Sequence, residues 1–219
     1  MGIAAIPPYP MPPESALPEP LVDWRPAPAR AALLIHDMQR YFLAPYQEVR
    51  SPAAELVGNI RLLAGRARAL GMPVLYTAQP GGMTTRERGL LHDFWGPGMR
   101  KDPVDNGIVD ELAPEPGDTV LTKWRYSAFV GSDLEERLRA GGRDQLIVCG
   151  VYAHVGVLMT ACDAFSRDIE TFFVSDAVAD FTEEYHRLAV RYAAERCAVA
   201  TSTGRLLAAL APAGAEPVS

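Results

Sequence analysis

The sequence predicts an α/β protein with a three-layer, doubly wound fold, in which helices cover both faces of a parallel β-sheet. Short apolar runs that suit buried strands alternate along the chain with longer amphipathic stretches that suit helices. Of the 219 residues, 48% are hydrophobic and 22% charged, an ordinary composition for a globular protein. We therefore predict a single domain at 29–211, with a proline-rich arm at 1–28 and a tail at 212–219.

Six apolar segments are the candidates for strands. Polar residues, glycines or prolines bound most of them, as expected for strands buried on both faces. In chain order they are 31–35, 73–77, 119–123, 146–149, 171–174 and a short segment near 199–201. Because helices separate them, the strands should run parallel and bring their carboxyl ends to one edge of the sheet.

Polar start signals place two of the helices. Ser51 is expected to cap a helix that has Pro52 at its first position and ends at Gly71. Ser132 and Glu135 have the spacing of a capping box, which predicts a second helix start.

Two loops and one further helix complete the pattern. Residues 79–104 form a long loop, which in a compact domain is usually functional and often a lid. Residues 176–180 are expected to be the loop after the fifth strand. The helix that starts near Thr182 should point three side chains toward the sheet: Leu188, Tyr192 and Ala193.

Charge and composition disfavour several classes of protein. A net charge of −6 and a pI near 5.3 argue against a surface for nucleic acid or an anionic membrane. No apolar run is long enough for a membrane helix, and the N-terminus lacks the basic start of a signal peptide. The three cysteines lie in apolar contexts without metal-ligand spacing. We therefore expect a cytoplasmic protein with reduced core thiols and no cofactor.

Three strand ends should open onto one crevice. Asp37 follows the first strand, Lys123 ends the third, and residues 150–152 join the fourth strand to the next helix. Asp37 could be a general acid or only cap the next turn, and Lys123 could belong to a structural ion pair. Together with a helix N-terminus, the two could bind an acidic substrate and donate a proton.

Other polar and aromatic residues allow both a structural and a functional interpretation. Four aromatic residues near strand ends or in the long loop could pack in the core or form a pocket wall: Phe42, Trp95, Tyr126 and Tyr152. Arg86 and Arg88 could be solvated, or one of them could contact a carboxylate. The four histidines lack metal-ligand spacing, and Cys162 has no histidine spaced to activate it, so we expect structural roles for them.

Five motifs in order along the chain resemble the isochorismatase family. They lie at 36–39, 78–80, 93–98, 123–129 and 150–156, and the likeness extends from the arm to about residue 210. The resemblance implies a six-stranded parallel sheet, a homodimer and a non-prolyl cis peptide around Val151–Tyr152.

Most members of the wider superfamily are cysteine hydrolases that act on amides such as nicotinamide. Their Asp, Lys and Cys lie on these three strand ends, and their pattern places the cysteine at Gly156 of this chain. The segment 77–80 also lacks the histidine of the metal-binding nicotinamidases. The resemblance therefore disfavours an amidase and implies no metal.

Members without this thiol hydrolyse a vinyl ether. The segments 37–43 and 79–91 are similar to the 2-amino-2-deoxyisochorismate hydrolases of phenazine-type pathways. This implies a chorismate-derived dicarboxylate as substrate, with pyruvate and trans-2,3-dihydro-3-hydroxyanthranilate as products. The alternative is an isochorismatase of a siderophore-type route, which releases 2,3-dihydro-2,3-dihydroxybenzoate. Such enzymes often carry a C-terminal carrier domain, which we expect to be missing because the sequence ends at Ser219. A non-catalytic binding protein with this fold is the alternative from another class.

The resemblance also implies roles for particular residues. Asp37 would donate the proton, Lys123 would hold a substrate carboxylate and orient Asp37, and Gly156 would leave room for the substrate. The remaining substrate-binding residues would be Gln79, Arg88 and Tyr152 on the polar side, beside Gly156, and Phe42, Trp95 and Tyr126 on the apolar wall.

Overall fold

The computed structural model describes residues 3–47 and 50–211, so the expected tail at 212–219 lies outside the described residues. Six parallel strands form one sheet in the order β3-β2-β1-β4-β5-β6, as the fold class required. The strands are β1 (Ala31–His36), β2 (Val74–Ala78), β3 (Thr119–Thr122), β4 (Gln145–Val151), β5 (Glu170–Ala179) and β6 (Val199–Thr201). The order reverses between β1 and β4, where doubly wound sheets form a crevice at their carboxyl edge.

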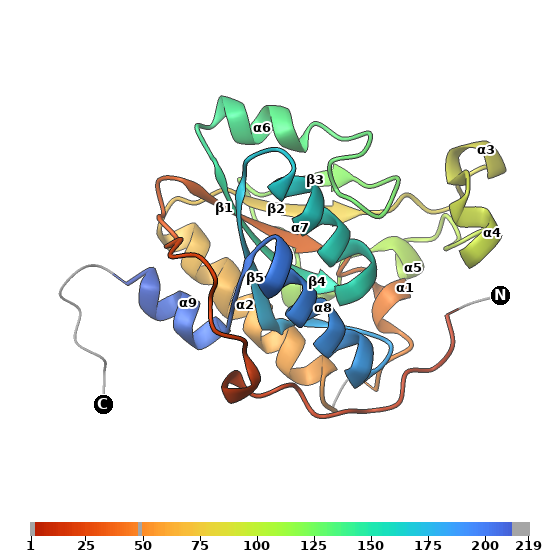
Figure 1. Ribbon diagram of the computed structural model, residues 1–219. Helices are drawn as coiled ribbons and strands as arrows, with labels where there is room; N and C mark the ends of the chain where they lie inside the picture. Colours follow the sequence, from red (N-terminus) through yellow and green to blue (C-terminus); the bar gives the residue numbers. More distant parts are fainter. Residues whose placement is uncertain (1–2, 48–49, 212–219) are drawn as a thin grey trace.

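Helices cover both faces of the sheet and make three layers (Figure 1). One face carries α2 (Ala53–Ala69) and α9 (Thr203–Ala209). The other carries α6 (Leu134–Ala140), α7 (Leu158–Phe165) and α8 (Glu183–Arg196). Every residue of β1 and β4 is buried, whereas β3 lies at the edge and is partly exposed. The expectation of a buried third strand was therefore wrong, because an edge strand has only one neighbour.

Short helices lie at the carboxyl edge of the sheet. They are α1 (Arg40–Leu43), α3 (Thr85–Arg88), α4 (Leu91–Trp95) and α5 (Pro103–Asn106). Three of them divide the segment 79–104, which was expected to be an irregular loop. Thr84 and Glu87 form a capping box that starts α3. In Figure 1, α3 and α4 project from the same end of the molecule as α1.

The proline-rich arm packs on the side of the sheet that carries α2 and α9. Its one regular element is η1 (Glu14–Ala16), as far as the structure describes it. Ile6 and Tyr9 are buried in the core on this face, and the Tyr9 hydroxyl lies 3.2 Å from His186 Nδ1. The arm therefore adds to the core of its own subunit.

Both predicted helix caps were wrong. The Ser51–Pro52 peptide is cis, Pro52 precedes α2, and the Ser51 hydroxyl accepts a hydrogen bond from Met11 N at 2.9 Å. Ser132 Oγ donates to Ala128 O and accepts from Leu134 N at 3.3 Å, so it does not make the capping-box bond to Glu135 N, and Glu135 pairs with Arg139 and Arg167. Ser51 is used by a tertiary contact with the arm, whereas Ser132 bonds to backbone groups of its own turn.

The predicted inward face of α8 was also wrong. Leu188 and Tyr192 are 38% and 46% exposed, whereas Ala193 is buried as expected. The face toward the sheet consists of His186, Ala189, Val190, Ala193 and Ala194. Small side chains let the helix approach the sheet closely, so the large apolar residues lie outside. The fifth strand also continues to Ala179, through most of the segment expected to be a loop.

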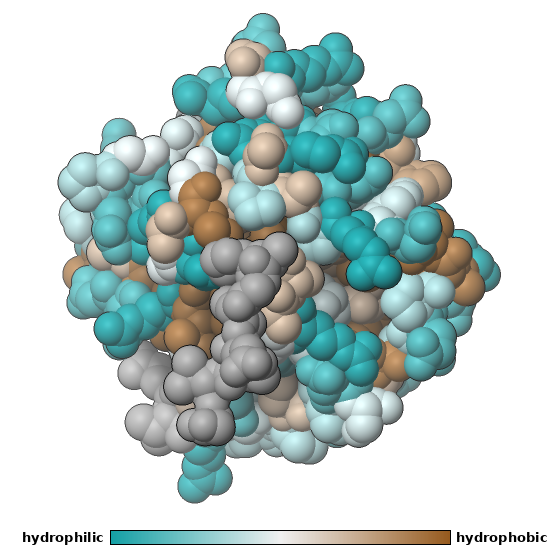
Figure 2. All heavy atoms as spheres, turned by 90° about the vertical axis from the view of Figure 1, so that its left-hand side faces the viewer, coloured by the Kyte–Doolittle hydropathy of each residue, from teal (hydrophilic) through white to brown (hydrophobic). Residues whose placement is uncertain are grey.

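The end of the molecule opposite α3 and α4 presents a mostly hydrophilic surface. Figure 2 shows this face, with smaller hydrophobic areas between the polar residues. Among the residues that the structure describes, no helix is both long enough and apolar enough to span a membrane.

Candidate active site

A cavity opens at the carboxyl edge of the sheet, and its empty space of about 560 Å³ includes a part that is open to solvent. It is lined by all nine residues to which the sequence pointed: Asp37, Phe42, Gln79, Arg88, Trp95, Lys123, Tyr126, Tyr152 and Gly156. It also has lining residues that were not anticipated: Ile3, Tyr41, Leu91, Val151 and Val155. Ile3 shows that the arm reaches the cavity, and no local signal in the sequence indicated this.

Asp37 is the buried acid of the cavity. It follows β1 directly, has a left-handed backbone conformation with φ of 51°, and is 4% exposed. Thr77 Oγ1 donates to Asp37 Oδ1 at 2.5 Å and accepts from Asp37 N at 3.1 Å. Lys123 Nζ lies 2.9 Å from Asp37 Oδ2. Both carboxylate oxygens therefore have a partner that favours the ionised form.

Opposing effects act on the pKa of Asp37. Burial by itself raises this pKa, because a carboxylate loses hydration when it leaves water. The charge of Lys123, the neighbouring His36 and the Thr77 hydrogen bond outweigh burial and hold the pKa below its ordinary value. The free protein therefore holds Asp37 as a carboxylate at neutral pH.

Gln79 connects this acid to a buried cation. Its Nε2 donates to Asp37 Oδ2 at 3.3 Å, and its Oε1 accepts from Arg88 Nη1 at 3.2 Å. Gln39 is fully buried and holds the backbone of Gln79 through two hydrogen bonds of 2.8 and 2.9 Å. Arg88 Nε donates to Gly96 O at 2.9 Å. Within the described residues Arg88 has no carboxylate partner, so its charge is available to an anionic ligand.

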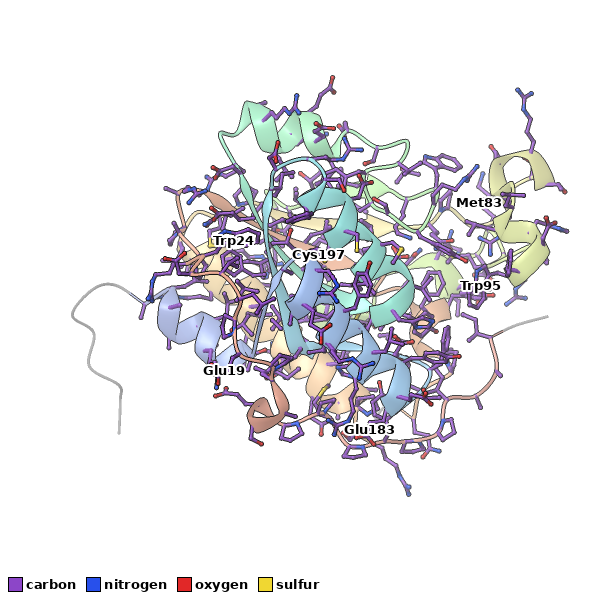
Figure 3. The ribbon with its side chains drawn as sticks, viewed as in Figure 1. Glu19, Trp24, Met83, Trp95, Glu183 and Cys197 are labelled. Atoms are coloured by element: carbon purple, nitrogen blue, oxygen red, sulfur yellow. The ribbon has the colours of Figure 1, made fainter. Side chains whose placement is uncertain are left out.

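Aromatic side chains form one wall of the cavity. Trp95, labelled in Figure 3 at the projecting end of the molecule, donates from Nε1 to the Tyr126 hydroxyl at 2.8 Å. The Tyr152 hydroxyl donates to Phe42 O at 2.7 Å. Phe181 packs against two of these rings, with centroid distances of 4.2 Å to Tyr152 and 5.9 Å to Trp95. Phe181 therefore supports the wall from behind, a role that its place in the sequence did not indicate.

Gly156 lies in the π-helical turn η3 (Ala153–Val157), which follows β4 and leads into α7. The preceding peptide between Val151 and Tyr152 is cis, as the resemblance implied. An ideal Cβ at Gly156 would lie 2.2 Å from His36 Cε1. We expected Gly156 to leave room for the substrate. Instead, the His36 ring fills the space that a side chain at position 156 would occupy.

The other histidines and cysteines have structural surroundings. His154 Nδ1 lies 2.8 Å from the buried Asp180 carboxylate, and His186 Nε2 lies 2.8 Å from Ser175 O. All three cysteines are free, and Cys162 Sγ is 3.7 Å from Cys197 Sγ. Across the described residues, no group of three or more His, Cys, Asp or Glu side chains could hold a metal ion.

The arrangement can bind an anion and move a proton. Lys123 and Arg88 place two buried positive charges on the cavity. Asp37 is the titratable carboxyl group of the site: it pairs directly with Lys123 and is linked to Arg88 by the side chain of Gln79. Thr77 and Gln39 were missed, although both are polar residues at the ends of the same strands or just beyond them. The signal that identified Asp37 could have identified them too.

Comparison with known proteins identifies the family of this chain. Residues 31–205 match the isochorismatase domain family. The phenazine biosynthesis protein PhzD of Pseudomonas fluorescens is 54% identical over 94% of this chain and 99% of its own length. The isochorismatase of Bacillus subtilis (strain 168) is 53% identical over 100% of this chain and 71% of its own length.

A solved structure has the same fold. The cysteine hydrolase of Pseudomonas syringae pv. phaseolicola 1448A superposes with a TM-score of 0.79 and is 28% identical, over 88% of this chain and 97% of its own. Together with the family match over the whole domain, these relatives show that the chain belongs to the isochorismatase family of hydrolases.

Proposed function

We propose that this protein hydrolyses the vinyl ether of 2-amino-2-deoxyisochorismate to pyruvate and trans-2,3-dihydro-3-hydroxyanthranilate. The observation that carries the proposal is the buried Asp37–Lys123 pair on a cavity whose position 156 has no side chain. A carboxyl group that can donate a proton is present, and the position of the superfamily thiol is occupied by glycine. This combination suits acid-catalysed hydrolysis without a covalent intermediate.

The reaction needs one proton donor and one water molecule. Asp37 donates a proton to the methylene carbon, which becomes the methyl group and leaves an oxocarbenium ion at the neighbouring carbon. Water adds to that carbon, and its proton restores Asp37. The hemiketal then collapses: the bond between the hemiketal carbon and the ring oxygen breaks, and the hemiketal hydroxyl becomes the ketone of pyruvate. The proton that this hydroxyl loses balances the one that the ring oxygen takes up as it leaves as a hydroxyl. Substrate and water are thereby converted to pyruvate and the ring alcohol.

Charge explains how Asp37 becomes protonated. In the free protein Lys123 stabilises the carboxylate, which is the wrong form for a donor. The substrate brings two carboxylates, which Lys123 and Arg88 can bind. Its negative charge near Asp37 opposes the effect of Lys123 and raises the pKa of the acid. Substrate binding and protonation of Asp37 are therefore coupled.

The amino substrate is supported by the resemblance of 37–43 and 79–91 to the aminodeoxyisochorismate hydrolases and by the PhzD relative, named for phenazine biosynthesis. Isochorismate is the second candidate, because a relative at 53% identity is named isochorismatase. The two substrates differ in one amino or hydroxyl group, so the ratio of kcat/KM for the two decides between them.

Pyruvate release tests the proposal. Purified protein is given each substrate without added metal, and Asp37→Asn and Asp37→Ala are compared with Asp23→Asn, which changes an exposed aspartate of the arm. We expect turnover that prefers the amino substrate, is lost in both Asp37 variants and is unchanged in the control. Equal activity in Asp37→Asn would favour a non-catalytic role for this pair.

We also propose a homodimer in the cytoplasm. Tyr185, Leu188 and Tyr192 lie on the outward face of α8 and are between 38% and 46% exposed, so a second copy of the chain could cover them. The three free cysteines suit a reducing compartment. Analytical ultracentrifugation and cell fractionation test the two statements, and a purely monomeric species would contradict the first.

A further inference from the structure

His36 is a buried histidine that the proposed reaction does not use. It ends β1, is 1% exposed, and its ring lies against the turn η3. An ideal Cβ at Gly156 would lie 2.2 Å from Cε1, 3.0 Å from Nδ1 and 3.1 Å from Nε2 of this ring. A methyl group at position 156 therefore collides with the whole edge of the imidazole, and a ring this deeply buried has little space to move.

The backbone does not explain the glycine. Gly150, six residues earlier, has φ of 108° and requires glycine for its conformation. Gly156 is not among the residues with a positive φ, so an L-residue could adopt its backbone conformation. The contact with His36 is what excludes a side chain at this position.

Hydrogen bonds tie the same ring to the cavity wall. Nδ1 lies 3.1 Å from Val151 O, to which the Nδ1–H tautomer of the ring donates a hydrogen bond. Nε2 lies 3.2 Å from Thr160 Oγ1, which itself donates to Gly156 O at 2.8 Å. His36 therefore contacts both ends of the segment that contributes Val151, Tyr152, Val155 and Gly156 to the cavity.

The ring is neutral at physiological pH. Burial is the main cause that lowers the pKa of His36, to about 4, and Lys123 adds to this, whereas Asp37 opposes it. His36 Nδ1 is 3.7 Å from Asp37 Oδ2, so a charged ring would compete with Lys123 for the acid. A neutral ring leaves the Asp37–Lys123 pair undisturbed.

We propose that His36 is a positioning residue: its ring fills the volume of a side chain at 156 and holds the 151–156 backbone against Asp37. The complementary pair His36–Gly156 keeps every side chain, including a nucleophilic one, out of position 156. The predicted effects on the urea midpoint do not depend on the proposed function, whereas the predicted effects on kcat and KM rest on the proposed hydrolysis.

A double-mutant cycle tests the pair. The proteins are wild type, His36→Ala, Gly156→Ala and the double variant, with Gly58→Ala as the control. Gly58 is exposed on α2, and a Cβ there would meet no atom within 4 Å. Urea midpoints at neutral pH report stability, and kcat and KM for pyruvate release report positioning.

We expect Gly156→Ala to lower the urea midpoint and to lower kcat by ~100-fold, the loss expected when catalytic groups are misplaced by about 1 Å. In the His36→Ala background, Gly156→Ala should have a much smaller effect on the urea midpoint and on kcat, because the imidazole no longer occupies the space that the new methyl group needs. Gly58→Ala should match wild type in kcat and KM, and its urea midpoint should not fall, because alanine is favoured over glycine in a helix interior. If Gly156→Ala does not fold alone, folding of the double variant supports the proposal, and its failure beside a folded His36→Ala overturns it.

The variant His36→Asn separates the two roles proposed for His36, holding the 151–156 backbone in place and filling the space beside Gly156. Its side-chain amide can still donate to Val151 O, so we expect it to keep more of kcat than His36→Ala does, with KM changed less than kcat. Equal kcat in wild type, His36→Asn and His36→Ala overturns the positioning role. Equal effects of Gly156→Ala in both backgrounds overturn the steric role. If wild type releases no pyruvate, the proposed function fails, while the coupling of urea midpoints still decides the steric role.

Discussion

Lys123 Nζ lies 2.9 Å from Asp37 Oδ2, and both side chains are almost completely buried. The two residues come from the ends of β3 and β1, which are separated in the sheet by β2. Thr77, at the end of β2, completes the contact by donating to the other carboxylate oxygen. Three strand ends therefore meet at one carboxyl group, and Lys123 and Thr77 are among the groups that hold its pKa below the ordinary value.

The first prediction concerns the stability of this pair. Asp37→Asn leaves the buried Lys123 cation without a carboxylate, and loss of one partner of a buried pair costs about 3–5 kcal/mol. Asp37→Asn/Lys123→Met removes both charges and should regain part of this loss. Urea unfolding at pH 7 measures the free energies. A double variant no more stable than Asp37→Asn would show that the lone lysine is not the source of the loss.

The second prediction concerns pH and activity. The pKa of Asp37 is lowered in the free protein, and a donor must be protonated, so kcat/KM should fall as pH rises above that pKa. Bound substrate carboxylates raise the pKa in the complex, so the descending limb of kcat should lie at higher pH than that of kcat/KM. A kcat that increases with pH through neutrality would instead identify Asp37 as a base.

The third prediction concerns Thr77. Its hydrogen bond is one of the causes that lower the pKa of Asp37. Thr77→Val removes the donor with little change of shape, so the descending limb of kcat/KM should move to higher pH. Thr77→Ser keeps the hydroxyl and serves as the control. If the descending limb of kcat/KM has the same pH in Thr77→Val as in wild type, Thr77 does not lower the pKa of Asp37.

The fourth prediction concerns His36 and stability. The pKa of His36 is lowered to about 4 in the folded protein, below 6.5 for an exposed histidine. The unfolded chain therefore takes up a proton first, and stability falls as pH decreases from 6.5 toward 4, by roughly 1.4 kcal/mol per pH unit. His186 acts in the same direction, so wild type must be compared with His36→Asn. The difference between their urea midpoints should shrink over this range, and a constant difference would show that His36 does not titrate.

Patterns of apolar residues were enough to predict the strands and the place of the acid. Asp37 was found because a carboxylate after a buried run must lie at a strand's carboxyl end, and Lys123 was found in the same way. The five motifs then identified the family, which the comparisons confirmed.

Features that depend on contacts between distant segments could not be predicted. Ser51 is used by Met11 of the arm and not by the helix beside it. Leu188 and Tyr192 lie outside because alanines pack α8 against the sheet. The contact between His36 and Gly156 joins residues 120 positions apart, and each residue alone has an ordinary interpretation. Local spacing contains no information about such pairs.

The most direct test of the proposed mechanism is the fate of oxygen from water. Turnover of 2-amino-2-deoxyisochorismate in H₂¹⁸O is stopped early, and the ring product is analysed by mass spectrometry. If Asp37 protonates the methylene carbon and water adds to the resulting oxocarbenium ion, the ring hydroxyl keeps its original oxygen and carries no ¹⁸O. Appearance of ¹⁸O in the ring hydroxyl would show that water attacks the ring carbon, and would contradict the mechanism proposed for Asp37.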